Sequence, residues 1–424
     1  MLVLWLSHFI PYPPRGGNAQ RSFNLIKQVS RFGDVAVFAL NLQGEPAERV
    51  EEYRKSLEEY CVEVEIWNLP YRWKGQRWWA ELARSPLSSL PFSVRALFSP
   101  ALFERWKSQL ARHPEALAHL DSIDLALYGA EIRGRPSLLN HHNCESALAF
   151  RRAEHETNPV KKGVLGLEAR KLARQESRLC RAFDVNTVVC EEDRRRLMER
   201  DSTAHFHVVE NGVDTDYFRP VGGTEEKHTA IFTGTLDWQP NLSAIRYLSR
   251  EIWPQVKQEC PDAKLILAGK NPPAEVFRLA GAISGVEVFA NPSDMRPLLA
   301  RAGVYVCPLL EGGGTRLKIL DAMAVGKAVV STTIGCEGLR VRTEQDILRR
   351  DGTAEFASAV LRLFREDGFR AEVGQSARAV AEREYSWVRM GRQLKTAYEC
   401  ATRAMQEPDC AIAEMDAAAR ESRC

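Results

Sequence analysis

The stretch from Glu311 to Lys327, EGGGTRLKILDAMAVGK, has the residue types and spacing best suited to binding an anion. It lies between two apolar runs, VYVCPLL and AVVSTT, which predict buried strands. Glycines between a strand and a helix permit close approach of backbone to a ligand, and the helix start presents free N–H groups and a positive dipole end. We therefore expect Gly313, Gly314 and Thr315 to border a site for a negatively charged ligand.

Two cations and one acid follow these glycines. Arg316 and Lys318 fall in the first turn of the predicted helix, where positive charges oppose the dipole unless an anion is bound. Arginine can bind a phosphate in bidentate fashion, and lysine adds a movable point charge. Asp321 lies six residues beyond Thr315, about 9 Å along the helix axis, close to the span from a diphosphate to ribose hydroxyls. The pattern predicts a nucleotide diphosphate site; a surface helix with solvated charges is the alternative.

The composition is that of an ordinary soluble enzyme, with 424 residues, 45% hydrophobic and 27% charged. This length exceeds what one core usually serves, so we expect two domains. Because 58 basic residues face 56 acidic ones, no global charge attracts nucleic acid, and we expect no nucleic-acid partner.

Ten cysteines are scattered along the chain without a C-x-x-C pair. They indicate reduced thiols in a cytoplasmic protein, not a disulfide framework or a zinc site. The opening MLVLWLSHF lacks a basic flank and a small-residue cleavage site, so we interpret it as a buried strand and not as a signal peptide. No apolar run approaches the length of a membrane span.

Short apolar runs alternate with segments of helical period along the whole chain. In the first half the predicted strands are LVLWLSHF, VAVFAL at 35–40, VEVEIW at 62–67, LALYG at 125–129 and VNTVVC at 185–190. The second half adds AIFTGTL, AKLILAG, VEVFA, VYVCPLL and AVVSTT after a polar linker at 219–229. This alternation predicts an α/β protein with two Rossmann-like domains built on parallel sheets.

We place the first domain at residues 1–205, the second at 206–385, and a C-terminal helix and frayed tail at 386–424. Neither half carries G-x-G-x-x-G after its first strand. A nicotinamide dehydrogenase is therefore disfavoured, because that turn lets the backbone approach a dinucleotide.

Three longer segments carry a family resemblance. PYPPRGGNAQRSFNLIKQVSRFGDVAVF, VVENGVDTDYFRP at 208–220, and the run from GVEVFANPSD to STTIGCEGL resemble the first loop, the interdomain signature and the donor half of glycosyltransferase family 4. The resemblance covers nearly the whole chain and is close to the bacterial polysaccharide type. It implies the GT-B fold, two Rossmann-like domains whose sheets face a central cleft, and a retaining enzyme that uses nucleotide sugars.

The resemblance assigns roles to single residues. Gly16 and Gly17 match the family's first glycine pair. Asp321 stands where the family has the glutamate that binds ribose, one methylene shorter. Gly313 stands where the family has its first glutamate, the usual contact to the donor sugar, and Glu311 comes two residues earlier, as a possible substitute.

A second departure concerns the diphosphate. The family's Gly-Arg and following lysine after the first donor-domain strand are replaced by TGTLDWQPN, which contains Gly234. Arg316 and Lys318 are then the candidate diphosphate clamp. Together with the backbone amides from Gly313 to Thr315, they would neutralise the negative charge that develops on the leaving group.

The segment NHHNCESALAFRR resembles the family's histidine-containing segment that faces the cleft. We expect His142 to orient the donor sugar or the acceptor, with Asn143 and Glu145 assisting. His8 and Arg15 are further candidates. A hydrogen-bonded structural role is the alternative for His142, and a capping or turn role is the alternative for His8 and Arg15.

The resulting function is transfer of a sugar from a nucleotide diphosphate sugar to a saccharide or lipid-linked saccharide with retention, in exopolysaccharide or surface glycan synthesis. The alternatives are a nucleotide-sugar epimerase of the same fold and a non-catalytic nucleotide-sugar-binding module. We expect no cofactor and no metal: Asp214 and Asp216 form an Asp-x-Asp, but inside this signature they structure a turn.

Residues 69–98 combine aromatic and basic residues: Trp73, Trp78 and Trp79 with Arg72, Lys74, Arg77 and Arg84. This composition suits an anionic membrane surface, and a helix packed on the sheet is the alternative. We therefore expect a cytoplasmic protein that can touch the inner membrane face peripherally.

Overall fold

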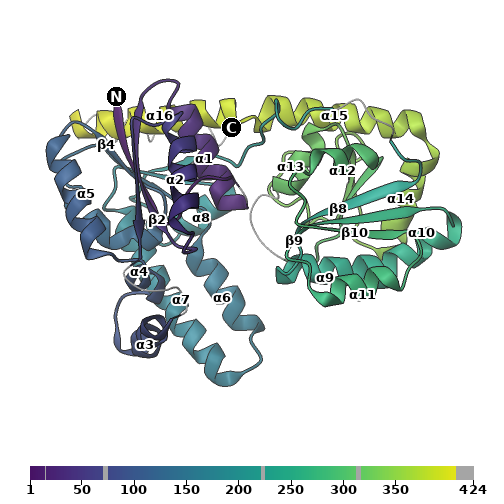
Figure 1. Cartoon of the computed structure of the whole chain (residues 1–424), viewed down its shortest axis with the longest axis horizontal. Coiled ribbons are helices and arrows are strands. Elements are labelled where there is room, and N and C mark those ends of the chain that lie inside the picture. The colour runs from purple at the N-terminus through teal and green to yellow at the C-terminus, as the bar shows by residue number, and fades with distance from the viewer. Residues whose placement is uncertain (15, 70–74, 221–224, 312–316, 407–424) are drawn as a thin grey trace. The chain divides into compact units, whose positions relative to one another are not determined.

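The computed structural model describes residues 1–14, 16–69, 75–220, 225–311 and 317–406. The chain divides into two compact units, one formed by Met1–Glu210 with Met390–Cys424 and the other by Asn211–Arg389. Each unit has its own parallel sheet with flanking helices (Figure 1). The predicted α/β class, with two Rossmann-like domains built on parallel sheets, is confirmed.

The sheet of the first unit has seven parallel strands in the order β3-β2-β1-β4-β5-β6-β7. Their bounds are β1 Leu2–Ser7, β2 Asp34–Asn41, β3 Glu63–Asn68, β4 Leu117–Leu120, β5 Ser137–Asn140, β6 Val185–Val188 and β7 Phe206–Val208. The helices are α1 Gly17–Val29, α2 Ala47–Glu58, α3 Gln76–Arg84, η1 Ser85–Leu87, α4 Phe92–Ala96, α5 Pro100–Arg112, η2 Ile123–Glu131, α6 Glu145–His155, α7 Pro159–Cys180, α8 Glu191–Met198 and α16 Trp387–Gln406.

One strand prediction is wrong. Residues 125–129 do not form a strand but lie in the 3₁₀ segment η2, and the strand that pairs with β1 on the side away from β2 is the short strand β4. Ser122 accepts a hydrogen bond from the backbone N–H of Asp124 and so starts a helical turn. Apolar periodicity cannot separate a short buried strand from a short buried helix, which explains the error.

The second unit has six parallel strands in the order β10-β9-β8-β11-β12-β13. Their bounds are β8 Thr229–Thr235, β9 Lys264–Lys270, β10 Val286–Ala290, β11 Val304–Cys307, β12 Ala328–Ser331 and β13 Leu348–Arg349. The helices are α9 Gln239–Tyr247, η3 Leu248–Ile252, α10 Trp253–Glu259, α11 Ala274–Gly281, α12 Arg296–Arg301, α13 Leu317–Ala324, α14 Thr353–Arg365 and α15 Asp367–Tyr385.

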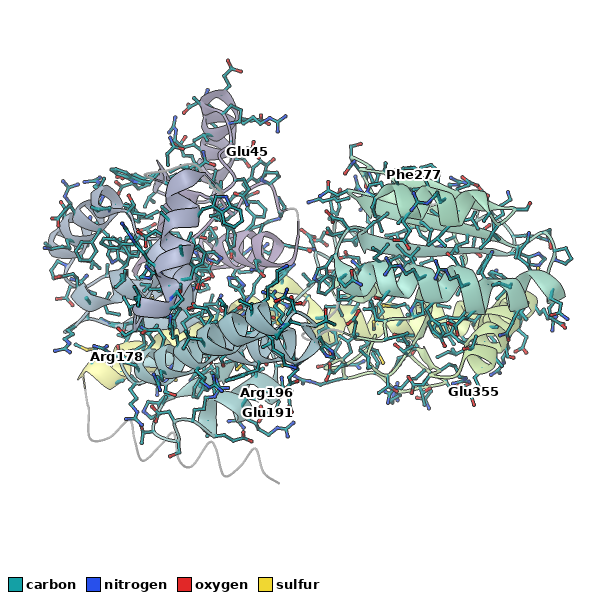
Figure 2. All side chains as sticks on the ribbon, turned by 90° about the horizontal axis from the view of Figure 1, so that it is seen from below. Glu45, Arg178, Glu191, Arg196, Phe277 and Glu355 are labelled. Carbon is teal, nitrogen blue, oxygen red and sulfur yellow. The ribbon has the colours of Figure 1, made fainter. Side chains whose placement is uncertain are left out.

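Helices cover both faces of this second sheet. Figure 2 shows Phe277 of α11 and Glu355 of α14 on opposite sides of the unit. The strands between are apolar on both faces, and the buried side chains of Phe232 and Tyr305 belong to one continuous core. Burial on both faces is why the strands are continuous apolar runs and not alternating ones.

The close approach of β8 and β9 is set by glycine. Gly234 pairs with Gly269, and a Cβ at Gly269 would lie 1.7 Å from the backbone oxygen of Gly234. Only a residue without a side chain fits there. The carboxyl end of β8, where the predicted donor-site glycine lies, therefore depends on Gly269.

Gly269→Ala should lower the free energy of unfolding by about 3 kcal/mol, because the backbone must move to accept the extra methyl group. Urea unfolding of the full chain measures the loss. Gly281→Ala is the matched control in the same unit, since a Cβ there meets no atom within 4 Å. Equal stability of the two variants would contradict this account.

Candidate functional site

In the second unit, the predicted donor residues gather where β8 ends and α13 begins. Gly234 has a φ of 153°, and a Cβ there would lie 2.7 Å from Asn241 Nδ2 and 3.1 Å from Lys318 Nζ. The structure thus brings Gly234 and Lys318 together, although they are far apart in sequence. A ligand at this point would meet backbone and an ammonium group.

Lys318 is held in place by neighbours from two other elements. Its ammonium group donates to Asn241 Oδ1, and it lies 4.3 Å from the centre of the Phe232 ring. Asn241 is itself fixed, because its Nδ2 donates to the backbone oxygen of Thr235 at 2.8 Å. Asn241 therefore orients the candidate cation.

Asp321 lies half-buried one turn further along α13. The hydroxyl of Tyr305 is 2.9 Å from Thr233 Oγ1, and burial, then Cys307, then Asp321 raise the pKa of Tyr305. Asp321 is therefore close enough to this buried pair of hydroxyl groups, on β8 and β11, to act on it electrostatically.

Glu311 lies outside the α13 helix and is exposed. Its Oε1 accepts a hydrogen bond from Ser243 Oγ of α9 at 2.9 Å. This contact ties the end of the segment after β11 to α9. The other predicted donor-loop residues, Gly313, Gly314, Thr315 and Arg316, lie outside the described residues and stay predictions.

In the first unit, polar side chains gather at the carboxyl ends of β1, β4 and β5. The centre is Asp121, which directly follows β4 and is fully buried. It accepts hydrogen bonds from Ser22 Oγ at 2.5 Å and Asn140 Nδ2 at 2.8 Å. His142, predicted as a catalytic residue, has its Nε2 3.4 Å from Asp121 Oδ1.

The Asp121 carboxylate stays ionised despite its burial. Burial by itself would raise its pKa, but the electrostatic interaction with the nearby imidazoles of His142 and His119 holds the pKa well below its ordinary value. His119 is fixed in turn, because its Nδ1 lies 2.8 Å from the Tyr398 hydroxyl and its ring stacks on Trp5. An ionised carboxylate therefore faces the imidazole of His142.

A buried guanidinium lies in the same network. Arg21 of α1 donates to Asn140 Oδ1 at 3.0 Å and to the backbone oxygen of Glu210 at 3.1 Å. Burial, opposed by Asp121, lowers the pKa of Arg21 to about 10, so the group stays charged at neutral pH. Asn140 joins the two charges, since it accepts from Arg21 and donates to Asp121.

Asp121, Arg21 and Asn140 were missed from the sequence. The available signal was a polar residue at each strand end: Asp directly after LAHL, and Asn closing SLLN. The first was hidden by the wrong strand prediction at 125–129. For Arg21, nothing in an otherwise ordinary amphipathic helix marks its burial.

His8 and Glu145 lie beside the same network. The rings of His8 and His142 are 6.0 Å apart, and burial lowers the pKa of His8 to about 4. Glu145 begins α6 and accepts from Asn143 Nδ2 at 3.2 Å; burial, then Asp124, raises its pKa to about 7. A carboxyl group close to half-protonated at neutral pH can exchange a proton with a bound hydroxyl.

The remaining predicted residues that the structure describes lie at a helix start and in a turn. Gly16, with a φ of 99°, precedes α1, which begins at Gly17, while Arg15 lies outside the described residues. Asp214 Oδ1 accepts from the backbone N–H groups of Asp216 and Tyr217, so this carboxylate structures a turn.

The burial of neutral His8 makes stability depend on pH. Its pKa is about 4 in the folded chain against an ordinary 6.5, so between these values the unfolded state binds a proton that the folded state does not. Stability should therefore fall as the pH falls from about 6.5 to about 4. Chemical unfolding at several pH values should give a shallower slope for His8→Gln, with the exposed His155→Gln as control. An unchanged slope in His8→Gln would contradict the assignment.

Comparison with known proteins agrees with these features. The model described as Glycosyltransferase Family 4 matches residues 15–217, and that described as Glycosyl transferases group 1 matches residues 227–366. A phosphatidyl-myo-inositol mannosyltransferase of Mycolicibacterium smegmatis is 28% identical over 203 residues, 45% of this chain and 51% of the relative. An uncharacterized 44.6 kDa protein in the cps region of Klebsiella pneumoniae is 28% identical over 162 residues, 37% of this chain and 42% of that protein.

The chain thus spans about half the length of the curated relatives it matches. The crystal structure of Anabaena HepE in complex with UDP superposes with a TM-score of 0.65 at 15% identity, over 94% of this chain and 100% of that one. At this identity the likeness concerns the fold. With the two family models matching consecutive parts of the chain, the protein belongs to the family 4 glycosyltransferases of GT-B fold.

Proposed function

We propose that this protein transfers a sugar from a nucleotide diphosphate sugar to a saccharide or lipid-linked saccharide acceptor, with retention of anomeric configuration. The observation that carries the proposal is the placement of Lys318 beside Gly234 at the carboxyl end of β8. In open parallel sheets, ligands bind beyond the carboxyl ends of the strands. A cation beside side-chain-free backbone at that edge suits a diphosphate.

The donor side has to stabilise the leaving group. As the bond from sugar to diphosphate breaks, negative charge grows on the phosphate oxygens, and a fixed cation lowers the energy of that state more than that of the ground state. Asn241 and Phe232 already hold the Lys318 ammonium, so little reorganisation is needed. We propose that Arg316 and the backbone amides of Gly313 to Thr315 stabilise the same negative charge on the phosphates. Asp321 would bind the ribose hydroxyls.

The first unit supplies an oriented imidazole. The Asp121 carboxylate lies 3.4 Å from His142 Nε2 and favours this placement of the ring, from which His142 can hydrogen-bond a sugar or acceptor hydroxyl. Glu145, through its raised pKa, can assist that contact. The retaining chemistry that the family resemblance implies needs no nucleophile from the enzyme. We therefore propose that these residues orient the sugar or the acceptor.

We further propose that the transfer needs no metal ion and no cofactor. Fixed cations and helix-end amides perform the electrostatic task that a divalent ion performs elsewhere. Asp214, the first residue of the Asp-x-Asp, is engaged with the backbone of its own turn.

For donor and acceptor we propose a hexose nucleotide and a lipid-linked acceptor. The similar mycolicibacterial protein is named as a mannosyltransferase acting on phosphatidyl-myo-inositol, and the structural neighbour was solved with UDP. The relative from a cps region supports a role in surface polysaccharide synthesis.

Incubating the full chain with labelled GDP-mannose, UDP-glucose and related donors, with and without chelator, tests the proposal. Transfer or slow hydrolysis of one donor, unchanged by chelator, is expected. An epimerase would instead return an isomeric sugar nucleotide. Binding without any turnover across the panel would favour the non-catalytic module.

The membrane proposal rests on the exposed residues of α3 and η1. Among the described residues no helix is both long and apolar enough to cross a membrane. Trp79 is 56% exposed and Leu87 92% exposed, and Arg84 next to them is largely solvated. Arg72, Trp73 and Lys74, and the side chains of Arg77 and Trp78, lie outside the described part. We propose a cytoplasmic protein that binds an anionic membrane surface at α3.

Lys318→Ala should weaken donor binding or turnover by about 2 to 4 kcal/mol, because a charged contact to the diphosphate is lost. The same loss is expected for Arg316→Ala. Titration calorimetry with the donor found in the panel, and kcat/KM, measure it. Lys264→Ala, at the other end of the same sheet and paired with Glu226, is the control. If both Lys318→Ala and Arg316→Ala keep the donor affinity and kcat/KM of the wild type, the diphosphate does not bind at these residues.

Flotation with liposomes tests membrane binding. Anionic vesicles should retain the protein at low salt and neutral vesicles much less, since each basic residue near an anionic surface adds only about 1 kcal/mol. Replacing Trp79 and Leu87 with Ala should reduce retention, whereas Trp238→Ala, an exposed tryptophan of the other unit, should not. If binding to the vesicles changes neither with salt nor with these substitutions, α3 is not the segment that contacts the membrane.

A further inference from the structure

A second cluster of ligating side chains lies in the second unit, at the end of the sheet opposite to Gly234 and Lys318. His228 directly precedes β8, Cys260 follows α10, and Asp262 lies in the turn before β9. Because β8 and β9 are parallel neighbours with Thr229 opposite Lys264, their amino ends lie side by side. The topology therefore gathers an imidazole, a thiol and a carboxylate at one point.

The three ligand atoms are close together. His228 Nδ1 lies 2.8 Å from Asp262 Oδ2, Cys260 Sγ lies 3.2 Å from Asp262 Oδ1, and one ligand atom of each residue lies within 4.8 Å of the others. Zinc bonds of about 2.1 Å to N and O and about 2.3 Å to S would place tetrahedral ligands roughly 3.4 to 3.6 Å apart. The observed contacts of 2.8 and 3.2 Å are slightly shorter than that value, and no two of the ligand atoms are more than 4.8 Å apart.

The backbone of the cluster is fixed. The N–H of Lys264 donates to the His228 oxygen at 2.9 Å, that of Cys260 to Val256, and that of Ala263 to Cys260. His228 has a φ of 53°, which is uncommon for a residue with a side chain. Its ring also packs against Phe364, 5.7 Å between centres. The imidazole is thus held toward the other two groups.

Access and charge also suit an ion. Cys260 is 9% exposed at the bottom of the cluster, while the His228 and Asp262 side chains are 31% and 70% exposed. The neighbouring cations are engaged: Arg365 pairs with Glu259, Lys264 with Glu226, and Lys257 donates to backbone oxygens of Pro261 and Ala263. An approaching cation would enter from solvent and meet the thiol last.

We propose that His228, Cys260 and Asp262 bind one divalent transition-metal ion of the zinc type, with water as the fourth ligand. Nitrogen, sulfur and oxygen donors together select such an ion over Mg²⁺ or Ca²⁺. Binding forms bonds from the ion to Cys260 Sγ, to His228 Nδ1 and to an Asp262 oxygen, and these ligands replace water molecules of the hydrated ion. The thiol proton of Cys260 leaves to solvent, and the bound imidazole carries its proton on Nε2. The ion would link the start of β8 to the turn before β9 and so stabilise this end of the sheet. The proposed site does not depend on the proposed glycosyl transfer.

Cobalt(II) titration of the metal-stripped, reduced full chain tests the site. One equivalent should produce a thiolate-to-cobalt charge-transfer band with tetrahedral d–d bands, and zinc should displace it. Cys260→Ser should abolish the charge-transfer band, while Cys190→Ser, at a partly exposed thiol of the other unit, should leave it unchanged.

His228→Asn and Asp262→Asn should each weaken cobalt binding at least tenfold. Asparagine tolerates a positive φ, so His228→Asn keeps the backbone conformation, and circular dichroism checks its fold. Zinc should also raise the thermal midpoint of the wild type but not of Cys260→Ser. Absence of a thiolate–cobalt band in the wild type, or a band that survives Cys260→Ser, would overturn the proposal and leave a hydrogen-bonded surface triad.

Discussion

Parallel pairing of strands constrains this protein more than any single contact does. In a parallel sheet every strand ends at the same edge, so residues that follow different strands meet in space however far apart they are in sequence. In the first unit the rule collects Asp121 and Asn140 behind β4 and β5. In the second it brings Gly234, at the carboxyl end of β8, close to the start of α13, which follows β11.

The same rule operates at the opposite edge, with different residues. The amino ends of β8 and β9 bring together His228 and Asp262, with Cys260 from the preceding helix. One edge thus offers backbone and a cation, which suits an anionic ligand, while the other offers soft and hard donor atoms, which suits a metal ion. The two edges of the sheet can bind different ligands because the strands between them are filled with buried apolar side chains, which separate the two sites.

Buried charge in the first unit requires compensation. Arg21 and Asp121 are both almost completely inaccessible, and each alone would cost several kcal/mol to bury. Asn140 connects them, and Ser22 and Thr187 satisfy remaining lone pairs. A network closed in this way has a single favoured arrangement, so the imidazole of His142 is positioned by the core of its unit and not by a flexible loop.

The sequence by itself determined the class of fold, because apolar runs of strand length alternate with helical periods and burial on both faces leaves a readable pattern. It also determined the family, through the motif around residues 208–220 and the donor half, and it marked His142, Gly234 and Lys318 as candidates.

Tertiary structure decided which residues surround these candidates. Asp121, Arg21 and Asn241 are ordinary residues in sequence, and so are His228 and Cys260, separated by 32 positions. Their meaning arises only when strand order and register bring them together, and a one-dimensional pattern carries periodicity but not strand order. The wrong strand at 125–129 illustrates the same limit, since it moved the end of the true strand away from Asp121.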